Sequence, residues 1–195
     1  MLMNITRIHG KPVLYSKIEQ KAREIEFSMP SDIYVGSLLK TLVASKPKGK
    51  ILEIGTGIGL SLSWMIAGMD KESTLINLDN DSKLIAIAKD FFEKDKSVEL
   101  ICQDASAWIK HYKGDPFDLI FADAWPGKYS EIEGTLDLIQ PGGFYIIDDM
   151  IKQPNWPDGH QENVDRLIKY LEQRKKFSIT KLNWSTGIVI ATKKA

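Results

Sequence analysis

Residues 51–61 read Ile51-Leu52-Glu53-Ile54-Gly55-Thr56-Gly57-Ile58-Gly59-Leu60-Ser61, an apolar run that passes directly into a glycine-rich loop. The run from Lys50 to Ile54 has the composition of a buried strand. Gly55 and Gly57 let the backbone turn sharply and let a ligand approach it closely. A helix expected from about Leu60 to Gly68 presents N–H groups that suit a carboxylate or a phosphate. The stretch therefore predicts a strand, a ligand-binding loop and a helix.

Further apolar runs follow along the chain, with helical patterns between them. The later predicted parallel strands are Thr74–Leu78, Val98–Cys102, Asp118–Ala122 and Phe144–Ile147. The helices expected between them run from about Asp81 to Glu93, through Trp108, and from about Ser130 to Ile139. Pro141-Gly142-Gly143 predicts a turn just before the fifth strand. Because strands and helices alternate, the sequence predicts βαβ units and a parallel sheet.

The two ends of the chain depart from this alternation. Residues 1–48 read as helical, with a cap at Pro30-Ser31-Asp32. The expected buried face of the second helix is Ile33, Leu38, Leu39 and Leu42. A helix from Glu162 to about Gln173 is followed by two β runs, Ser178–Asn183 and Gly187–Thr192, which should form an antiparallel hairpin.

We therefore expect one α/β domain over residues 1–195. Residues 1–48 would form an N-terminal helical extension and residues 49–195 the α/β core. The core would be a Rossmann-like, seven-stranded mixed sheet, with five parallel strands, the C-terminal antiparallel hairpin and helices on both faces.

Length and composition limit the function. Lys plus Arg and Asp plus Glu both number 26, so a nucleic-acid partner bound through bulk positive charge is not expected. Cys102 is the only cysteine, which fits a reducing compartment, and its place in a predicted strand indicates a small buried filler. We find no signal region and no apolar run long enough to span a bilayer. The sequence thus predicts a cytoplasmic protein with no membrane partner.

Acidic residues stand at the carboxyl end of every predicted parallel strand. They are Glu53, Asp79, Asp104, Asp123 and the pair Asp148-Asp149. Ligands of open α/β sheets bind at these carboxyl ends, near the point where the strand order reverses. Aspartate also caps helix N-termini, so one or two of these acids have a structural explanation. Acids at all five strand ends favour a binding site.

The glycine loop leaves two adenosine-containing ligands to consider. Asp79 ends the second strand, where an acid can accept the hydroxyls of a ribose from either NAD or S-adenosylmethionine (SAM). A dinucleotide fingerprint would need glycine at position 60, which is Leu60. Glu53, inside the strand end, suits an amino-bearing ligand better than a pyrophosphate. These residues argue against NAD.

Four stretches carry a resemblance to a known class. The run Ile51–Ser61 looks like motif I of the class I SAM-dependent methyltransferases. Asp79 is similar to their acidic ribose ligand, and Gln103-Asp104-Ala105 resembles their adenine-contact motif. The run Leu138-Ile139-Gln140-Pro141-Gly142-Gly143-Phe144 resembles the turn before their fifth strand. The resemblance covers about residues 29–192.

Two further stretches narrow the resemblance. Residues 117–125 and 145–149 look like the small-molecule O-methyltransferases of the catechol and caffeoyl-CoA type. The resemblance implies O-methylation of a small hydroxylated acceptor, with SAM as methyl donor. Related enzymes often pair, so it also implies a homodimer. An NAD-linked Rossmann oxidoreductase and a non-catalytic SAM-binding module are the alternatives.

The resemblance implies a cofactor role for each matching position. These positions are Glu53, Gly55, Thr56, Gly57, Ser61, Asp79, Asp104, Ala105, Asp123 and Trp125. The loop residues and Ser61 would hold the methionine part, and Asp79 the ribose. Asp104 and Ala105 would contact adenine, with Trp125 against its face.

The resemblance also implies a metal site. In metal-dependent relatives, the positions of Asp123, Asp148 and Asp149 bind a divalent cation. Hard carboxylate oxygens suit Mg²⁺, Ca²⁺ or another divalent cation, and a bound metal would lower the pKa of the acceptor hydroxyl. In many metal-free methyltransferases, the acid at the position of Asp123 contacts the amino group of SAM instead.

The sequence departs from the family at the expected general base. The catechol-type pattern has a lysine three residues after the fourth-strand aspartate, and this position is Pro126. Lys128, displaced by two residues, and His160 are the alternative bases, and Asp123 is the third candidate catalytic residue. Trp156, in the loop before His160, either covers the substrate or packs on the neighbouring helix.

Overall fold

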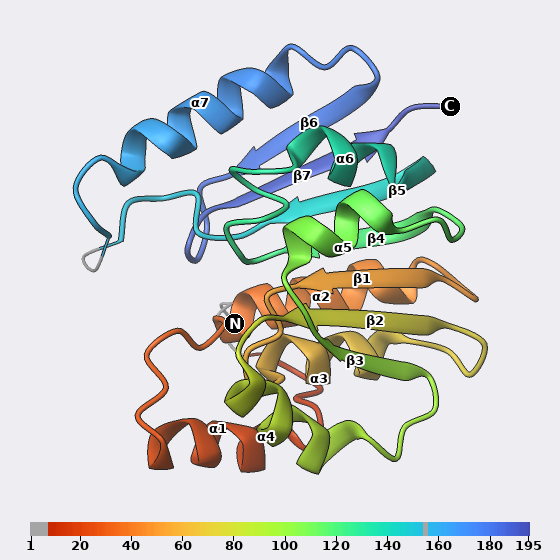
Figure 1. Cartoon of the computed structure of the whole chain (residues 1–195), viewed down its shortest axis with the longest axis vertical. Coiled ribbons are helices and arrows are strands. Elements are labelled where there is room, and N and C mark those ends of the chain that lie inside the picture. Colours follow the sequence, from red (N-terminus) through yellow and green to blue (C-terminus); the bar gives the residue numbers. More distant parts are fainter. Residues whose placement is uncertain (1–7, 154–155) are drawn as a thin grey trace, which may run out of the picture.

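The computed structural model of the protein describes residues 8–153 and 156–195. Within these residues, seven strands form one sheet in the order β3-β2-β1-β4-β5-β7-β6, with helices on both faces (Figure 1). The strands are β1 Lys50–Ile54, β2 Thr74–Asp79, β3 Val98–Cys102, β4 Phe117–Ala122, β5 Ile139–Ile147, β6 Phe177–Leu182 and β7 Ile188–Lys193. The helices are α1 Tyr15–Glu24, α2 Ile33–Ala44, α3 Leu60–Gly68, α4 Ser82–Phe92, α5 Ala105–His111, α6 Ile132–Asp137 and α7 His160–Glu172. This architecture confirms the predicted Rossmann-like mixed sheet.

The strand order reverses beside β1. From β1 the chain runs outward through β2 to β3, and it then returns to place β4 on the other side of β1. β1 pairs in parallel with β2 and with β4, and β4 pairs in parallel with β5. Ligands of such sheets bind where the order reverses, at the carboxyl ends of the strands.

The C-terminal hairpin lies at the other edge of the sheet. β6 and β7 pair antiparallel, from Phe177 opposite Lys193 to Leu182 opposite Ile188. β7 also pairs antiparallel with β5, which joins the hairpin to the parallel strands. The predicted hairpin is confirmed.

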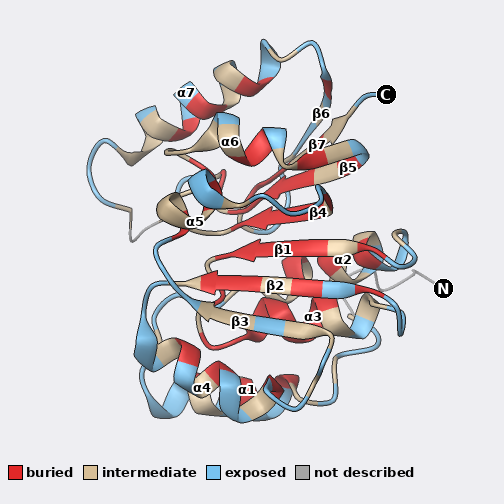
Figure 2. Ribbon diagram, turned by 45° about the vertical axis from the view of Figure 1, so that its right-hand side comes forward, coloured by how far each residue is buried: buried red, intermediate tan, exposed pale blue. Residues whose placement is uncertain are grey.

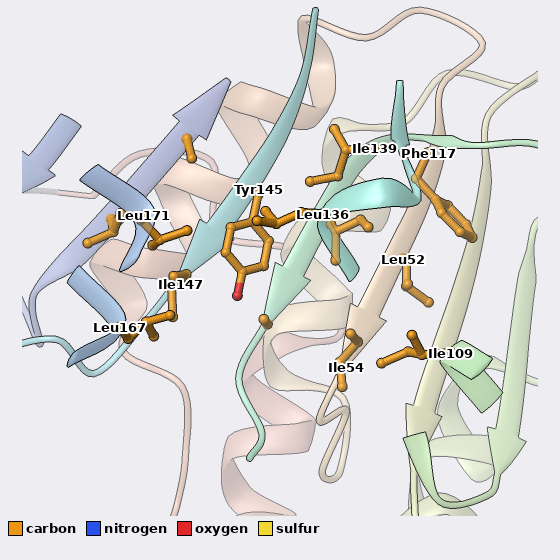
Figure 3. Packing of buried hydrophobic residues seen from close by; sticks show 14 of the residues in the cluster. Leu52, Ile54, Ile109, Phe117, Leu136, Ile139, Tyr145, Ile147, Leu167 and Leu171 are labelled. Carbon is orange, nitrogen blue, oxygen red and sulfur yellow. The ribbon is translucent and has the colours of Figure 1, made fainter. Parts of the chain in front are cut away.

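Residues that follow one another on the central strands pack into cores on opposite faces of the sheet. Ile51 packs with Trp64 of α3 in the core under α1, α2 and α3. Leu52 packs instead in the core under α5, α6 and α7, which Figure 3 shows together with Tyr145 and Leu167. Because both faces are covered, β1 and β4 are buried over most of their length, and their sequences are mostly apolar (Figure 2).

β5 begins earlier than the sequence predicts. Pro141-Gly142-Gly143 lies inside this strand and not in a turn before it. The pairing with β4 is irregular there, because Ile139 lies opposite Phe117 and Phe144 lies opposite Leu119. β5 therefore carries extra residues as a bulge, where the missing N–H of proline breaks no regular ladder. The predicted turn is wrong because bulges and turns use the same residue types.

Aspartate side chains cap the N-termini of several helices. At α2, Asp32 accepts a hydrogen bond from the N–H of Tyr34 at 2.7 Å. At α5, Asp104 accepts one from the N–H of Ala107 at 2.8 Å. These contacts satisfy N–H groups that have no partner within the helix. The predicted cap at Asp32 is confirmed.

The buried face of α2 agrees with the prediction only in part. Its buried residues are Val35, Gly36, Leu39 and Val43. Of the four predicted positions, Leu39 is buried, and Ile33, Leu38 and Leu42 are partly buried against the same core. A Cβ at Gly36 would lie 2.3 Å from the Trp64 ring, so α2 approaches α3 closely through its glycine. This close approach, which hydrophobic periodicity does not show, selects the face that is buried.

Cys102 is exposed, so its predicted role as a buried filler is wrong. β3 lies at the edge of the sheet, and its residues are half-buried or exposed (Figure 2). None of the helices formed by residues 8–153 and 156–195 is both long and apolar enough to cross a membrane.

Candidate functional site

The glycine loop after β1 is tied to the strands on both sides. The N–H of Gly55 donates to the carbonyl of Leu78 at 2.8 Å, and the N–H of Asp123 donates to the carbonyl of Ile54 at 2.8 Å. Gly55 has a φ of 97°, and a Cβ there would lie 2.7 Å from the carbonyl oxygen of Asp123. A side chain at Gly55 would therefore separate the β1 and β4 loops.

Glu53 lies beneath this loop and is fully buried. The Ser61 hydroxyl donates to Glu53 Oε1 at 2.5 Å. Glu53 Oε2 has no hydrogen-bond partner among the described residues. Burial, together with the charges of Asp123 and Asp79, raises the pKa of Glu53 to about 8 although the Ser61 hydrogen bond lowers it. A buried carboxyl with an unpaired oxygen fits a ligand that brings an ammonium group.

Asp79 connects the end of β2 to the glycine loop. Its Oδ2 accepts a hydrogen bond from the N–H of Gly57 at 2.8 Å. Its Oδ1 accepts one from the N–H of Asp81 at 2.9 Å. The carboxylate is therefore held in one orientation at the carboxyl edge of the sheet, where the sequence predicts a ribose ligand.

A cavity of about 210 Å³ opens beside Asp79. It is lined by Ile54, Gly55, Leu78, Asp79, Asn80, Gln103, Asp104, Ala105, Ala124, Trp125 and Pro126. The predicted cofactor residues in this lining are Gly55, Asp79, Asp104, Ala105 and Trp125. Its walls combine apolar groups with a few polar side chains, as small-molecule sites do.

The other predicted cofactor residues lie outside this lining. Thr56 and Ser61 are buried with Glu53 under the loop, and the Thr56 hydroxyl donates to the carbonyl of Leu78 at 3.4 Å. Asn80 and Pro126 line the cavity although the sequence does not single them out as ligands. The sequence signal shared by both is that each follows a strand-end acid within a few residues.

Asp123 lies at the end of β4 beside other charged groups, and its side chain is 16% exposed. The ammonium nitrogen of Lys128 lies 3.9 Å from Asp123 Oδ1, and Lys128 is buried, with 5% of the residue exposed. Burial raises the pKa of Asp123 to about 8, against the charge of Lys128, and Asp148 and Asp149 raise it further. We call Asp123, Asp148 and Asp149 the acidic cluster.

Asp148 already has partners within the chain. Its Oδ1 accepts hydrogen bonds from the Thr186 hydroxyl and, at 2.7 Å, from the N–H of Asp149. Burial raises the pKa of Asp148 to about 6, whereas the Thr186 hydrogen bond and the charge of Lys128 lower it. The charge of Lys128 thus acts on two members of the acidic cluster.

The arrangement does not fit a divalent cation. Among the described residues, His, Cys, Asp and Glu form no group of three or more placed to hold a metal ion. The positive charge beside Asp123 comes from Lys128, and an oxygen of Asp148 is engaged by Thr186. The predicted metal site at Asp123, Asp148 and Asp149 stays a prediction that this geometry does not support.

Aromatic side chains gather next to Lys128. Trp125 and Tyr129 have ring centroids 4.8 Å apart, and Tyr129 and His160 have centroids 5.3 Å apart. Trp156 lies 4.4 Å from His160 by the same measure. The Tyr129 hydroxyl and His160 Nε2 are 3.3 Å apart. Tyr129 thus lies near both Lys128 and His160, and Trp156 packs on the first residue of α7.

The strand order, the glycine loop after β1 and the acid at the end of β2 define the Rossmann-like fold of the class I methyltransferases. An O-methyltransferase from Bacillus cereus, solved in complex with S-adenosylhomocysteine, has this fold with a TM-score of 0.82 and 23% identity, covering 97% of this chain and 94% of that one. An O-methyltransferase from Streptomyces achromogenes, solved in complex with SAM, has a TM-score of 0.82 and is 22% identical. This match covers 97% of this chain and 93% of that one.

The chain belongs to the O-methyltransferase family, whose family model matches residues 10–194. A relative from Mycobacterium avium (strain 104), named "Putative O-methyltransferase", is 29% identical over 119 residues. This match covers 58% of the chain and 53% of the relative, so the chain spans little more than half the length of the curated relatives it matches.

Proposed function

We propose that this protein is a SAM-dependent methyltransferase that acts on a hydroxyl group of a small acceptor. The observation that carries the proposal is Glu53, whose buried carboxyl has an unpaired oxygen under a glycine loop. Asp79 and the cavity of about 210 Å³ continue from it along the carboxyl edge of the sheet. SAM would supply a methyl group on a positively charged sulfur. Family membership and relatives solved with SAM or S-adenosylhomocysteine support this reading.

Each part of the site would recognise a different part of the ligand. The unpaired oxygen of Glu53 offers a partner for an ammonium group. The N–H groups at the start of α3 would suit a carboxylate. Asp79 would accept the ribose hydroxyls. Asp104, Ala105 and the exposed ring of Trp125 line the cavity and would enclose adenine.

The acceptor would bind between Asp123 and the aromatic side chains. The rings of Trp125, Tyr129 and Trp156 favour a planar, partly apolar molecule. When its oxygen attacks the methyl carbon, the carbon–sulfur bond breaks and the hydroxyl proton must be taken up. Asp123, Lys128 and His160 are the candidate catalytic residues, and most of the rate would come from positioning.

The test is a calorimetric titration of the purified protein with S-adenosylhomocysteine, with NAD⁺ in parallel. We expect saturable binding of S-adenosylhomocysteine, no binding of NAD⁺, and loss of the heat in Glu53→Ala. Binding of NAD⁺ without any response to S-adenosylhomocysteine would overturn the proposal. A panel of hydroxylated aromatic compounds with isotope-labelled SAM would then identify the acceptor.

Further properties belong to the same proposal. We expect the chain to fold as one domain, with residues 1–48 packed on the core of residues 49–195, and to work as a cytoplasmic homodimer. The packing of α2 on α3 and the single cysteine are consistent with these expectations. Sedimentation of the purified protein tests the dimer. A divalent cation has no part in the proposal, because the residues do not fit one.

A further inference from the structure

The acidic cluster needs a positive charge. Asp123 follows β4, and Asp148 and Asp149 follow β5, the strand paired with β4. Asp123 is largely buried, and Asp148 is buried. Carboxylates brought together in such a place repel one another unless a cation or protons compensate them.

Lys128 is the cation that the structure places there. Its ammonium nitrogen lies 3.9 Å from Asp123 Oδ1, and its side chain is 6% exposed. A buried ammonium group is costly unless it is paired, so this placement requires the carboxylates as much as they require the lysine. The ring of Tyr129 lies 5.9 Å from the same nitrogen and adds a weaker favourable contact.

The backbone before Lys128 holds it in this position. Gly127 has a φ of 86°, and its N–H donates to the carbonyl of Ser130 at 2.8 Å. The buried Tyr145 hydroxyl donates to the carbonyl of Gly127. The N–H of Lys128 donates to the carbonyl of Trp125 at 3.3 Å. A tight turn anchored on β5 therefore directs the lysine toward the acidic cluster.

We propose that Lys128 is a resident cation that replaces a divalent metal ion in the acidic cluster, so that methyl transfer by this protein is independent of metals. The inference rests on the proposed function, and it concerns how the acceptor side of that site is charged. As an ammonium group, Lys128 would favour a negatively charged acceptor oxygen nearby and would have hydrogens to donate to it.

The experiment measures binding of Mn²⁺ to the metal-stripped protein by electron paramagnetic resonance. Lys128→Met keeps the apolar stem of the side chain and removes the charge, and exposed Lys169→Met on α7 is the matched control. We expect wild type and Lys169→Met to show only weak, unsaturated binding. Lys128→Met should bind Mn²⁺ at least about tenfold more tightly, because a positive charge near the carboxylates is gone.

Equal Mn²⁺ affinity of Lys128→Met and wild type would overturn the inference. So would saturable binding to wild type that is lost in Asp148→Asn. If Lys128→Met does not fold, the comparison of wild type with Asp148→Asn decides alone. Weak Mn²⁺ binding to wild type that Asp148→Asn leaves unchanged supports the inference. S-adenosylhomocysteine is titrated into the same samples. Failure of S-adenosylhomocysteine to bind would reject the proposed function. Metal-dependent methyl transfer by a protein that binds S-adenosylhomocysteine would reject only the role of Lys128.

Discussion

Glu53 is a fully buried carboxyl whose pKa is raised from its ordinary value of 4.5 to about 8. The folded state therefore holds a proton that the unfolded chain has lost in this pH range. Stability then falls as pH rises from 4.5 toward 8, because the folded state binds more protons than the unfolded state. Above pH 8 both states are ionised, and the destabilisation is complete.

Glu53→Gln should remove this pH dependence. We expect wild type to lose a few kcal/mol of unfolding free energy between pH 5 and pH 8 relative to Glu53→Gln, in line with roughly 1.4 kcal/mol per unit of pKa shift. Urea unfolding of both proteins at several pH values measures the difference. The exposed Glu99→Gln is the control. Parallel pH profiles of wild type and Glu53→Gln would contradict the prediction.

Asp79 acts on the loop as well as on the ligand. Asp79→Ala removes the acceptor of the Gly57 N–H and the expected partner of the ribose. S-adenosylhomocysteine should bind roughly 10- to 100-fold more weakly, since each lost hydrogen bond to a charged group is worth about 1.5–3 kcal/mol. Asp81→Ala removes the cap of α4 next to it and should cost about 1 kcal/mol of stability with affinity unchanged. Calorimetry on both variants separates the two effects.

At the scale of elements, the loop between β1 and α3 depends on glycine. Gly55→Ala places a Cβ 2.7 Å from the Asp123 carbonyl oxygen at a φ of 97°. Gly142→Ala, in β5, has a φ of 79° but nothing within 4 Å of its Cβ. Gly142→Ala should therefore cost only the conformational strain of about 1 kcal/mol.

Gly55→Ala should cost more than this and should also abolish binding of S-adenosylhomocysteine, because the β1 and β4 loops must separate. Thermal unfolding and calorimetry of the two variants make the comparison. Similar losses of stability, or binding retained in Gly55→Ala, would show that the close approach at this loop is not needed.

Elements with local signals could be predicted from the sequence, whereas those fixed by neighbouring elements could not. The cap at Asp32 needs only its own helix, and the glycine loop is recognisable from its own residues. The buried face of α2 depends on Trp64 in α3, and the bulge at Pro141 depends on pairing with β4. The same distinction holds in the site: the strand-end acids follow from the strand pattern, but the contact between Lys128 and Asp123 depends on the turn at Gly127.

At the scale of the whole molecule, the strand order brings the site together. β2 and β3 lie on one side of β1, and β4 and β5 lie on the other. The cavity takes Asp79 and Asp104 from the first side and Trp125 from the second. A ligand bound there contacts both halves of the sheet, so binding should stabilise the molecule as a unit.

S-adenosylhomocysteine should therefore raise the temperature of a single cooperative unfolding transition. At a ligand concentration about 100 times the Kd, mass action contributes roughly 2.7 kcal/mol. For a chain of this length, such a gain corresponds to a rise in Tm of roughly 5–10 °C. Calorimetric scans at increasing ligand concentration measure it, with NAD⁺ and the Gly55→Ala variant as controls. If the ligand instead split the transition in two, it would be stabilising only one half of the sheet, and the binding site would not span the strand reversal beside β1.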